Sequence, residues 1–349
     1  MQPNNRPVIA ITGLEGRDNP YPGCAVAKAL RAARGNSVKL VGLSYDPALT
    51  GAQRNDLFDQ VFVTPLPSDP PSAILRSLSE LRAKCGVQAV IPTLDSEIPL
   101  WSRLQAELLQ MGLATMLPPH SSVLARTKAR LPGFCKQHGF LAPETEPISD
   151  VHKHFARPDW SFPAWLKGPL ADAERVNSME EADAVYARLA ATWGFPVLAQ
   201  KPLHGVEYDM CAVARNGSID AAVTIRKVAL SSLGKAVAAV VVEDEGVARL
   251  ADKIVRALNW HGPLELEMMR AEDTGEFHLI EINARFPAWV GMTPGTGLNL
   301  PERVLATLLG ETITPAPAAR AGTLFVRTSR STVRPIEVLG NLLASGTDS

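Results

Sequence analysis

The sequence of 349 residues lacks several features that mark particular classes of protein. It has no charge excess of one sign, because 35 basic and 36 acidic side chains leave a net charge of −1. Neither nucleic acid nor an anionic membrane is therefore expected as a partner. The longest apolar run, residues 236–242, is far shorter than the roughly 20 residues that span a bilayer. The first residues also contain no apolar segment typical of a signal peptide.

Cysteine is scarce, and its spacing carries no motif. Cys24, Cys85, Cys135 and Cys211 are far apart and form no CxxC pair. A zinc site or a disulfide framework is therefore not expected, and reduced thiols predict a cytoplasmic protein. Glycine forms no GxGxxG motif in the early segment GLEGRDNPYPG, so nothing supports a dinucleotide site there.

The hydrophobic pattern predicts an α/β protein with about two domains. Up to about residue 118, apolar strands alternate with helices, which predicts a parallel sheet covered on both faces. The expected strands cover residues 7–13, 38–43, 61–63 and 87–92, and the expected helices cover 25–33, 74–84 and 100–110.

A second unit is expected to begin with a basic helix over residues 121–138, interrupted at Pro132 and Gly133. Strands then dominate, and the segment after Glu311 has the composition of a linker. The expected strands cover 162–167, 196–200, 210–215, 221–226, 237–242, 264–269 and 277–283, and the expected helices cover 178–192 and 246–258.

The most informative segment is a predicted hairpin formed by LELEMM and FHLIEINAR. Residues two apart in a strand face the same side, about 6.6 Å apart. Glu281 and Asn283 thus share a face, Glu267 can lie beside them, and Arg285 follows on the same side. Carboxylate and amide oxygens suit Mg²⁺. A surface hairpin with a solvated polar face is the alternative.

Three other segments have both a plain and a functional interpretation. The connection after Gln200, leading to Glu207, is either an ordinary hairpin loop or a site for an adenine and a ribose. Lys167, at a strand end, is either solvated or a point charge for a phosphate. Asp95 and Glu97 are expected to cap the following helix, with contact to a substrate amine as the alternative.

Taken in order, a lysine at a strand end, a hinge with GxE and a final ExNxR resemble the ATP-grasp superfamily, close to its carbamoyl-phosphate-synthetase-like branch. The resemblance covers roughly residues 7–312 and includes VIPTLDSE and NARFPAWVGMTPGTGLNLPERVLATLLGE. It implies a pre-ATP-grasp domain over 1–120, an ATP-grasp domain over 121–315 with lobes of about 121–199 and 200–315, and a tail over 316–349.

The resemblance also implies roles for individual residues. Arg285 and Lys167 would be catalytic, with Arg285 stabilising an anionic intermediate. The metal ligands would be Glu267, Glu281 and Asn283. The nucleotide would be bound by Lys128, Lys167, Gln200, Lys201, Leu203, Glu207, Arg226, Lys227 and Lys235.

These roles predict an ATP-dependent ligase that uses Mg²⁺, or Mn²⁺ in its place. It would join a carboxylate to an amine or related nucleophile through an acyl phosphate. The partners would be small-molecule or peptide carboxylates and amines, and a homodimer is allowed. One departure matters: LKGPLADAERVN, after Lys167, has no glycine cluster to cover phosphates. A non-catalytic ATP-binding module is therefore the alternative function.

Overall fold

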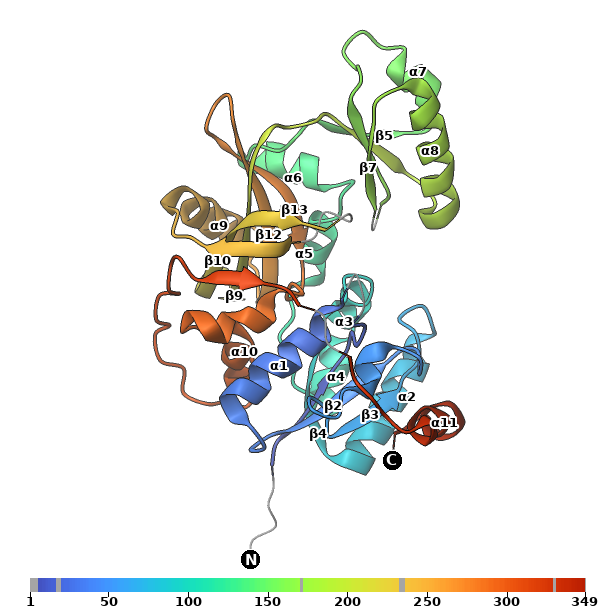
Figure 1. Cartoon of the computed structure of the whole chain (residues 1–349), viewed down its shortest axis with the longest axis vertical. Coiled ribbons are helices and arrows are strands. Elements are labelled where there is room, and N and C mark those ends of the chain that lie inside the picture. The colour runs from blue at the N-terminus through green and yellow to red at the C-terminus, as the bar shows by residue number, and fades with distance from the viewer. Residues whose placement is uncertain (1–5, 17–19, 170–171, 232–235, 329–330, 349) are drawn as a thin grey trace, which may run out of the picture.

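The computed structural model describes residues 6–16, 20–169, 172–231, 236–328 and 331–348. These residues form three sheets, stacked along the long axis of the molecule (Figure 1). The sheet nearest both termini is parallel, and the other two are antiparallel. The predicted fold class, an N-terminal parallel-sheet unit followed by two lobes, is confirmed. The antiparallel pairing in both lobes is a finding of the structure.

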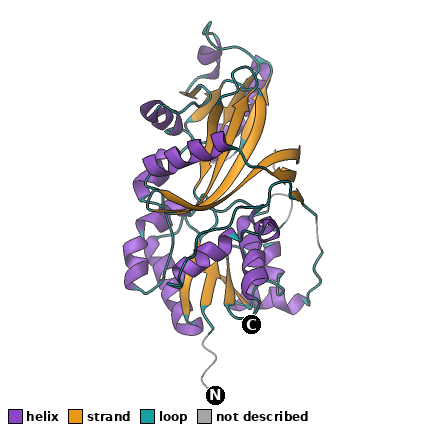
Figure 2. Ribbon diagram, turned by 90° about the vertical axis from the view of Figure 1, so that its left-hand side faces the viewer, coloured by secondary structure: helices purple, strands orange, loops and turns teal. Residues whose placement is uncertain are grey.

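The parallel sheet has the strand order β3-β2-β1-β4. Helices lie on both sides of it (Figure 2), which explains why nearly every residue of β1 and β2 is buried. Its strands are β1 (Val8–Ile11), β2 (Lys39–Ser44), β3 (Gln60–Val63) and β4 (Val87–Ile91), and its helices are α1 (Pro22–Arg34), η1 (Thr50–Gln53) and α2 (Pro71–Cys85). The single helix expected over 100–110 is instead two, α3 (Ile98–Arg103) and α4 (Gln105–Gln110), separated at Leu104.

The basic helix expected over 121–138 is also two shorter helices, α5 (His120–Ala125) and α6 (Leu131–His138). The break is at 126–130, before the predicted interruption, and Pro132 lies within the first turn of α6, where a proline is tolerated. Lys128 therefore lies in a turn rather than in a helix.

The four-stranded antiparallel sheet has the order β5-β8-β6-β7 and forms the lobe at the far end from the termini (Figure 1). It contains β5 (Thr145–Ile148), β6 (Ala164–Lys167), β7 (Ala173–Val176) and β8 (Val197–Gln200), together with α7 (Val151–Phe155) and α8 (Met179–Trp193). The hydroxyl of Ser178 accepts a hydrogen bond from the backbone N–H of Glu181 and so begins α8 where the sequence predicts.

The six-stranded antiparallel sheet has the order β13-β12-β9-β10-β11-β14. Helix α9 (Glu245–Ala257) covers one of its faces, where Met210, Leu264 and Ile282 pack into the core. In chain order, the first five strands of this sheet are β9 (Gly205–Arg215), β10 (Ser218–Leu230), β11 (Ala236–Val241), β12 (Gly262–Ala271) and β13 (Phe277–Asn283). Because strand side chains alternate, the opposite face is free to carry polar residues.

The carboxyl-terminal segment is not the free tail expected over 316–349. After η2 (Val290–Thr296) and α10 (Leu300–Leu308), β14 (Leu324–Val326) pairs with β11 as the sixth strand. Helix α11 (Ile336–Ser345) then returns to the parallel sheet, where the N–H of Val63 donates to the carbonyl of Gly346 at 2.7 Å. The end of the chain thus ties the two sheets together.

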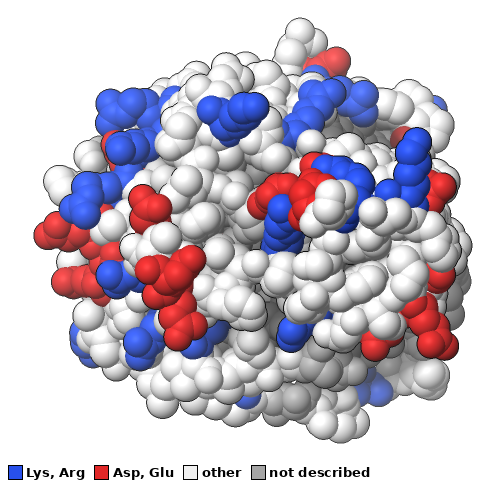
Figure 3. All heavy atoms as spheres, turned by 90° about the horizontal axis from the view of Figure 1, so that it is seen from above, with Lys and Arg blue, Asp and Glu red and all other residues white. Residues whose placement is uncertain are grey.

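Surface and thiol chemistry agree with the composition. In the described residues, no helix is long and apolar enough to cross a membrane. All four cysteines are free thiols. On the face shown in Figure 3, basic and acidic side chains lie in several small groups, some of them mixed, with uncharged areas between the groups.

Candidate active site

Polar side chains gather on the face of the six-stranded sheet opposite α9. In the β12–β13 hairpin, Glu265 lies directly across from Asn283, and Glu267 lies directly across from Glu281. Directly opposed residues share a face, so all four side chains point to the same side. The sequence prediction that Glu267, Glu281 and Asn283 share a face agrees with this register.

Strand β9 extends this polar face, because Asp209 lies directly across from Glu267. Lys227 of β10 supplies the opposite charge, with its Nζ 3.0 Å from Glu207 and 3.3 Å from Asp209. Burial raises the pKa of Asp209 despite the nearby Lys227. The other oxygen of Asp209, Oδ1, is buried and has no hydrogen-bond partner among the described residues.

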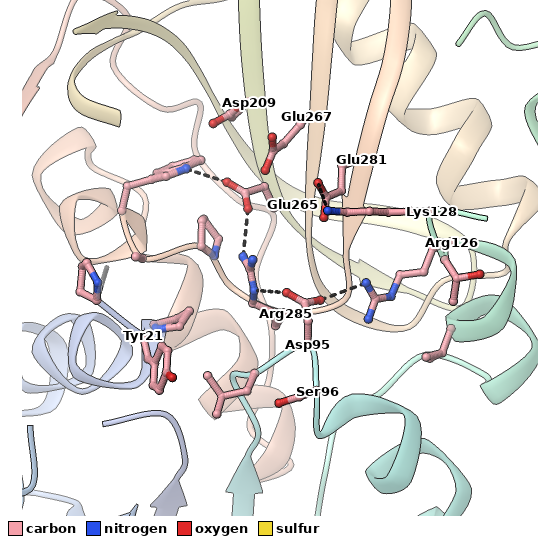
Figure 4. Close-up of a pocket in the computed structure, with 18 of the residues that line it drawn as sticks. Tyr21, Asp95, Ser96, Arg126, Lys128, Asp209, Glu265, Glu267, Glu281 and Arg285 are labelled. Atoms are coloured by element: carbon pink, nitrogen blue, oxygen red, sulfur yellow. Dashed lines mark hydrogen bonds and ion pairs between the residues drawn. The ribbon is translucent and has the colours of Figure 1, made fainter. Parts of the chain in front are cut away.

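Arg285 lies just beyond β13 and connects the polar face to the parallel-sheet domain (Figure 4). Its Nε donates to Asp95 at 2.7 Å, and its Nη1 donates to Glu265 at 2.9 Å. Arg126 lies 3.0 Å from the second oxygen of Asp95. Burial alone would raise the pKa of Asp95, but Arg285 and Arg126 outweigh it and the pKa is lowered.

Glu265 is almost fully enclosed, with 4% of its surface exposed. It accepts hydrogen bonds from the indole of Trp289 at 2.9 Å, from Arg285, and from the amide of Asn283 at 3.0 Å. The Asn283 amide also donates to Glu267 at 3.0 Å. These bonds fix the amide so that its nitrogen faces the two carboxylates and its oxygen remains as an acceptor.

The opposed pair Glu267 and Glu281 fits a cation site in charge and in donor type. Two carboxylates directly across a sheet repel each other unless a cation lies between them. Oxygen donors are what Mg²⁺ prefers, and it completes its shell with water and phosphate oxygens. No group of three or more His, Cys, Asp or Glu side chains in the described ranges could hold a metal ion by itself. A metal here would therefore need Asn283 or a ligand from a substrate.

Two lysines face this acidic hairpin. Lys128, in the turn between α5 and α6, has its Nζ 3.9 Å from Glu281. Lys167 ends β6 of the other antiparallel lobe, at the strand end that the sequence predicts. Burial lowers the pKa of Lys167 to about 8, an effect that Glu281 opposes and Lys128 reinforces.

The segment from Gln200 to Leu203 connects the two antiparallel sheets. Gln200 ends β8, and its side-chain amide donates to Thr145 at 2.8 Å. The backbone N–H of Lys201 donates a hydrogen bond to the carbonyl of Glu144 at 3.0 Å. Gly205 then starts β9, and a Cβ there would lie 2.1 Å from the carbonyl oxygen of Arg270. The glycine of GxE is thus required by close backbone approach.

Two adjacent cavities contain these groups. The larger, about 370 Å³, is lined by Asp209, Lys227, Glu265, Glu267 and Arg285 together with Asp95 and Arg126. The smaller, about 20 Å³, lies between the two antiparallel lobes and is lined by Lys167, Gln200, Leu198 and Leu279 among others. Lys128 and Glu281 line both.

Comparison with known proteins agrees with this architecture. Residues 195–330 match the model of a family described as ATP-grasp in the biosynthetic pathway with Ter operon. Most of the chain also superimposes on several solved structures. An L-amino acid ligase from Bacillus licheniformis has a TM-score of 0.63 at 16% identity, with 87% of this chain and 74% of that chain covered.

The chain has the ATP-grasp fold. The biotin carboxylase domain of 2-oxoglutarate carboxylase from Hydrogenobacter thermophilus has a TM-score of 0.68 at 14% identity, covering 90% of this chain and 73% of that one. N5-carboxyaminoimidazole ribonucleotide synthetase from Thermotoga maritima has a TM-score of 0.59 at 14% identity, covering 88% and 77%. No curated protein sequence is significantly similar. The resemblance to the ATP-grasp superfamily that the sequence motifs indicate is confirmed.

Not every predicted site residue of the ATP-grasp domain meets the others. Arg226 is exposed and lies on the opposite face of β10 from its neighbour Lys227, because adjacent strand residues alternate. Lys235 lies outside the described residues. The structure gathers the remaining predicted residues along the two cavities or on the segments that border them: Lys128, Lys167, Gln200, Lys201, Leu203, Glu207, Lys227, Glu267, Glu281, Asn283 and Arg285.

The structure adds residues that sequence reasoning missed. Glu265 is two residues before Glu267, and Asp209 is two after Glu207, so the same alternation argument could have placed both on the polar face. Arg126 carries no such signal, and for Asp95 the sequence indicates a helix cap or a contact to a substrate amine but no arginine partner. Asp95 is 190 residues from Arg285, and only the fold brings them together.

The expectation that Asp95 or Glu97 caps the next helix is wrong. Asp95 binds Arg285 and Arg126. Glu97 precedes α3 but makes no side-chain cap bond to that helix. Its carboxylate instead accepts from the backbone N–H groups of Thr93, at 2.7 Å, and Leu94, at 2.8 Å, which pulls the loop back against the end of β4.

The connection after Lys167 leads from β6 to β7. Strands β6 and β7 pair antiparallel with Lys167 opposite Ala173, and the N–H of Gly168 donates to the carbonyl of Asp172 at 3.2 Å. Arg175 lies directly opposite Trp165, so it shares a face with Lys167. The segment is a hairpin turn, and 170–171 lie outside the described residues.

Proposed function

We propose that the protein is an ATP-dependent ligase that uses Mg²⁺, or Mn²⁺ in its place, and joins a carboxylate to an amine or related nucleophile. One observation carries the proposal. Lys128 and Glu281 line both of two adjacent cavities at the polar sheet face, and Arg285 lines the larger of them. Cationic side chains at such a site can bind the phosphates of a nucleotide and a reacting carboxylate, and the carboxylates can bind a metal.

In this proposal, the nucleotide lies between the two antiparallel lobes. The backbone of Gln200, Lys201 and Leu203 would meet the adenine edge, and the apolar side chains of the small cavity would cover its ring. Glu207, with 39% of its side chain exposed, would hold the ribose hydroxyls. Lys128 and Lys167, from opposite sides, would neutralise the phosphates.

Glu267, Glu281 and Asn283 would hold the metal, which when bound neutralises phosphate charge during phosphoryl transfer. The opposed carboxylates and the fixed amide oxygen are the observations that support this assignment. Lys227, held by Glu207 and Asp209, would remain fixed beside the phosphates instead of sampling solvent.

The reaction would run in two steps. An oxygen of the substrate carboxylate takes the γ-phosphoryl group of ATP, and ADP leaves. The amine then attacks the acyl phosphate carbon, inorganic phosphate leaves, and the amine nitrogen loses a proton. Arg285, fixed by Asp95 and Glu265, would stabilise the oxygen that becomes negative in the second step.

The structural relatives support the proposal at the level of chemistry. The Hydrogenobacter thermophilus domain was solved as a dimer in complex with MgADP and bicarbonate, and the Bacillus licheniformis protein is named an L-amino acid ligase. We extend from them the use of Mg-ATP, a small carboxylate and a homodimer. The four free thiols support a cytoplasmic location.

The test is release of ADP and phosphate with a panel of amino acids, short peptides and small carboxylates. We expect release that depends on both a carboxylate and an amine, and its loss in Glu281→Ala. Glu276→Ala, at the exposed turn of the same hairpin, is the matched control and should behave like wild type. Absence of substrate-dependent release, together with Glu281→Ala resembling wild type, would refute catalysis.

A second candidate, an ATP-binding module without catalysis, is favoured by the short turn after Lys167. The sequence there has no glycine cluster, and in the described part of the turn the N–H of Gly168 already donates to the carbonyl of Asp172. Calorimetry separates the two functions. Tight Mg-ATP binding without turnover on any substrate would support the second.

A further inference from the structure

A second large cavity lies beside the active site, between α1 and the carboxyl-terminal segment. Its volume is about 1200 Å³. It is lined by the start of α1, by residues 48–57, and by described residues of 327–339. Pro20, Tyr21, Ala288 and Arg327 line both this cavity and the active-site cavity, so the two are neighbours. We call it the carboxyl-terminal cavity.

The charged side chains among the described residues that line the carboxyl-terminal cavity are all basic. Among its described lining residues, four are basic and none is acidic: Lys28, Arg54, Arg327 and Arg334. They come from three distant segments of the chain, so the clustering is produced by the fold and not by a basic run in the sequence.

Within the described residues, three of these four cations have no acidic partner. Arg54 pairs with Asp56 at 2.7 Å, and Arg334 donates to the carbonyl of Gln53 at 3.4 Å. Neither Arg327 nor Lys28 has an ion pair within the described residues. Burial lowers the pKa of Arg327, as expected for a cation without a compensating charge.

An uncompensated cation in a partly enclosed cavity is unfavourable until an anion binds. Guanidinium groups suit carboxylate and phosphate in particular, because two parallel N–H groups match two oxygens. Arg327 lies where the two cavities meet, while Arg54 and Arg334 lie only in the carboxyl-terminal cavity. The arrangement has two separate places for a negative group.

We propose that the carboxyl-terminal cavity binds the carboxylate substrate, and that this substrate carries at least two anionic groups. Arg327 holds the carboxylate that receives the phosphoryl group, and Arg54, Arg334 and Lys28 hold a second carboxylate or a phosphate. The inference rests on the proposed ligase function. The cavity exceeds the roughly 300–1000 Å³ of typical ligand sites, so it has room for a dipeptide as well as for a phosphorylated amino acid.

Calorimetry on the full chain tests the proposal with three probes: the dipeptide Glu-Glu, O-phosphoserine and the neutral-side-chain dipeptide Ala-Ala. We expect Glu-Glu or O-phosphoserine to bind at least tenfold more tightly than Ala-Ala. A preference for Glu-Glu identifies carboxylate as the second group, and a preference for O-phosphoserine identifies phosphate. Equal affinity for all three, or no binding of any, would overturn the proposal.

Two variants and a control locate the site. Arg327→Ala and Arg54→Ala should each weaken binding of the preferred probe at least tenfold, and Arg327→Lys should restore part of it. Arg320→Ala, in an exposed position of the same segment, should bind like wild type. Unchanged affinity in both Arg327→Ala and Arg54→Ala, with unfolding curves like wild type, would exclude this cavity.

Mg-ATP affinity measured on the same samples separates this inference from the ligase proposal. Glu281→Ala should weaken Mg-ATP binding and leave probe binding intact, and Arg54→Ala should do the reverse. If Mg-ATP binds and turns over but no anionic probe is preferred, the ligase function stands and the substrate inference fails.

Discussion

The active-site cavity and the carboxyl-terminal cavity share four lining residues but balance their charges in opposite ways. In the first, Arg285 and Lys227 each contact two acidic side chains. In the second, Arg327 and Lys28 contact none among the described residues. The cations of the first cavity are therefore neutralised by acidic side chains before any ligand binds. In the second cavity, Arg327 and Lys28 would be neutralised only by a bound anion.

This difference predicts opposite results when a charge is removed. A charge deleted from the first cavity leaves buried partners uncompensated, which costs stability. A cation deleted from the second relieves an unfavourable environment, so stability is kept and only ligand affinity falls. The following predictions test this contrast.

The largest effect is expected for Arg285→Met, which keeps the size of the side chain and removes its charge. Asp95 and Glu265 would lose their shared cation, so the free energy of unfolding should fall by about 3–5 kcal/mol. Urea unfolding measures it. Arg249→Met, which removes an exposed pair with Glu245, is the control and should cost less than about 1 kcal/mol. Equal losses in the two variants would contradict the contrast.

Asp95→Asn should have the next largest effect. The neutral amide still accepts a hydrogen bond, but it no longer balances Arg285 and Arg126. We expect a loss of about 1–3 kcal/mol in unfolding free energy and a fall in kcat larger than the change in KM, because Arg285 is less firmly oriented. Asp252→Asn, in an exposed helical pair with Arg256, should leave kcat unchanged.

A pH dependence should follow from Lys167, whose pKa is lowered to about 8 mainly by burial. The charged form binds phosphate, so Mg-ATP affinity should be full below pH 8 and fall as the pH rises through 8. The limit is about tenfold per pH unit for one proton. Affinity measured from pH 7 to 9.5 tests this.

Lys167→Arg should flatten that profile, because a guanidinium stays protonated over this range. Lys136→Arg, on the exposed surface of α6, should keep the wild-type profile. A profile that is the same in wild type and Lys167→Arg would mean that another group titrates.

The smallest effect on stability is expected for Arg327→Gln. Because Arg327 has no acidic partner among the described residues, its removal should change the unfolding free energy by less than about 0.5 kcal/mol, or raise it slightly. Urea unfolding beside Arg285→Met provides the direct comparison. A loss above 1 kcal/mol would show that the carboxyl-terminal cavity is also balanced internally.

Many residues of the active-site cavity could be predicted from the sequence, because the alternation of side chains along a strand depends only on near neighbours. In LELEMM and FHLIEINAR, a period of two is enough to place Glu267, Glu281 and Asn283 on one face, and the turn between them sets their pairing. The position of Lys167 at a strand end is similarly local. The missed acids Glu265 and Asp209 obey the same rule.

The sequence predictions failed where a residue's position depends on contacts with segments far away in the chain. Arg226 and Lys227 are adjacent in the sequence, and only the pairing of β10 with β9 decides that Lys227 faces Glu207. The linker-like residues after Glu311 are irregular as expected, but the sequence did not predict that β14 pairs with β11 or that α11 packs near β3. Short segments such as β14 have too weak a pattern of their own, because their stability comes from the partner strand.

The sequence by itself determined the parallel sheet of the first domain and the polar face of the hairpin. Each of these follows from periodicity and turn chemistry between near neighbours. Only the tertiary structure decided that Asp95 fixes Arg285, and that Arg54, Arg327 and Lys28 surround one cavity. Those contacts join segments far apart in the chain, where pairing depends on how the sheets pack and leaves no trace in local residue order.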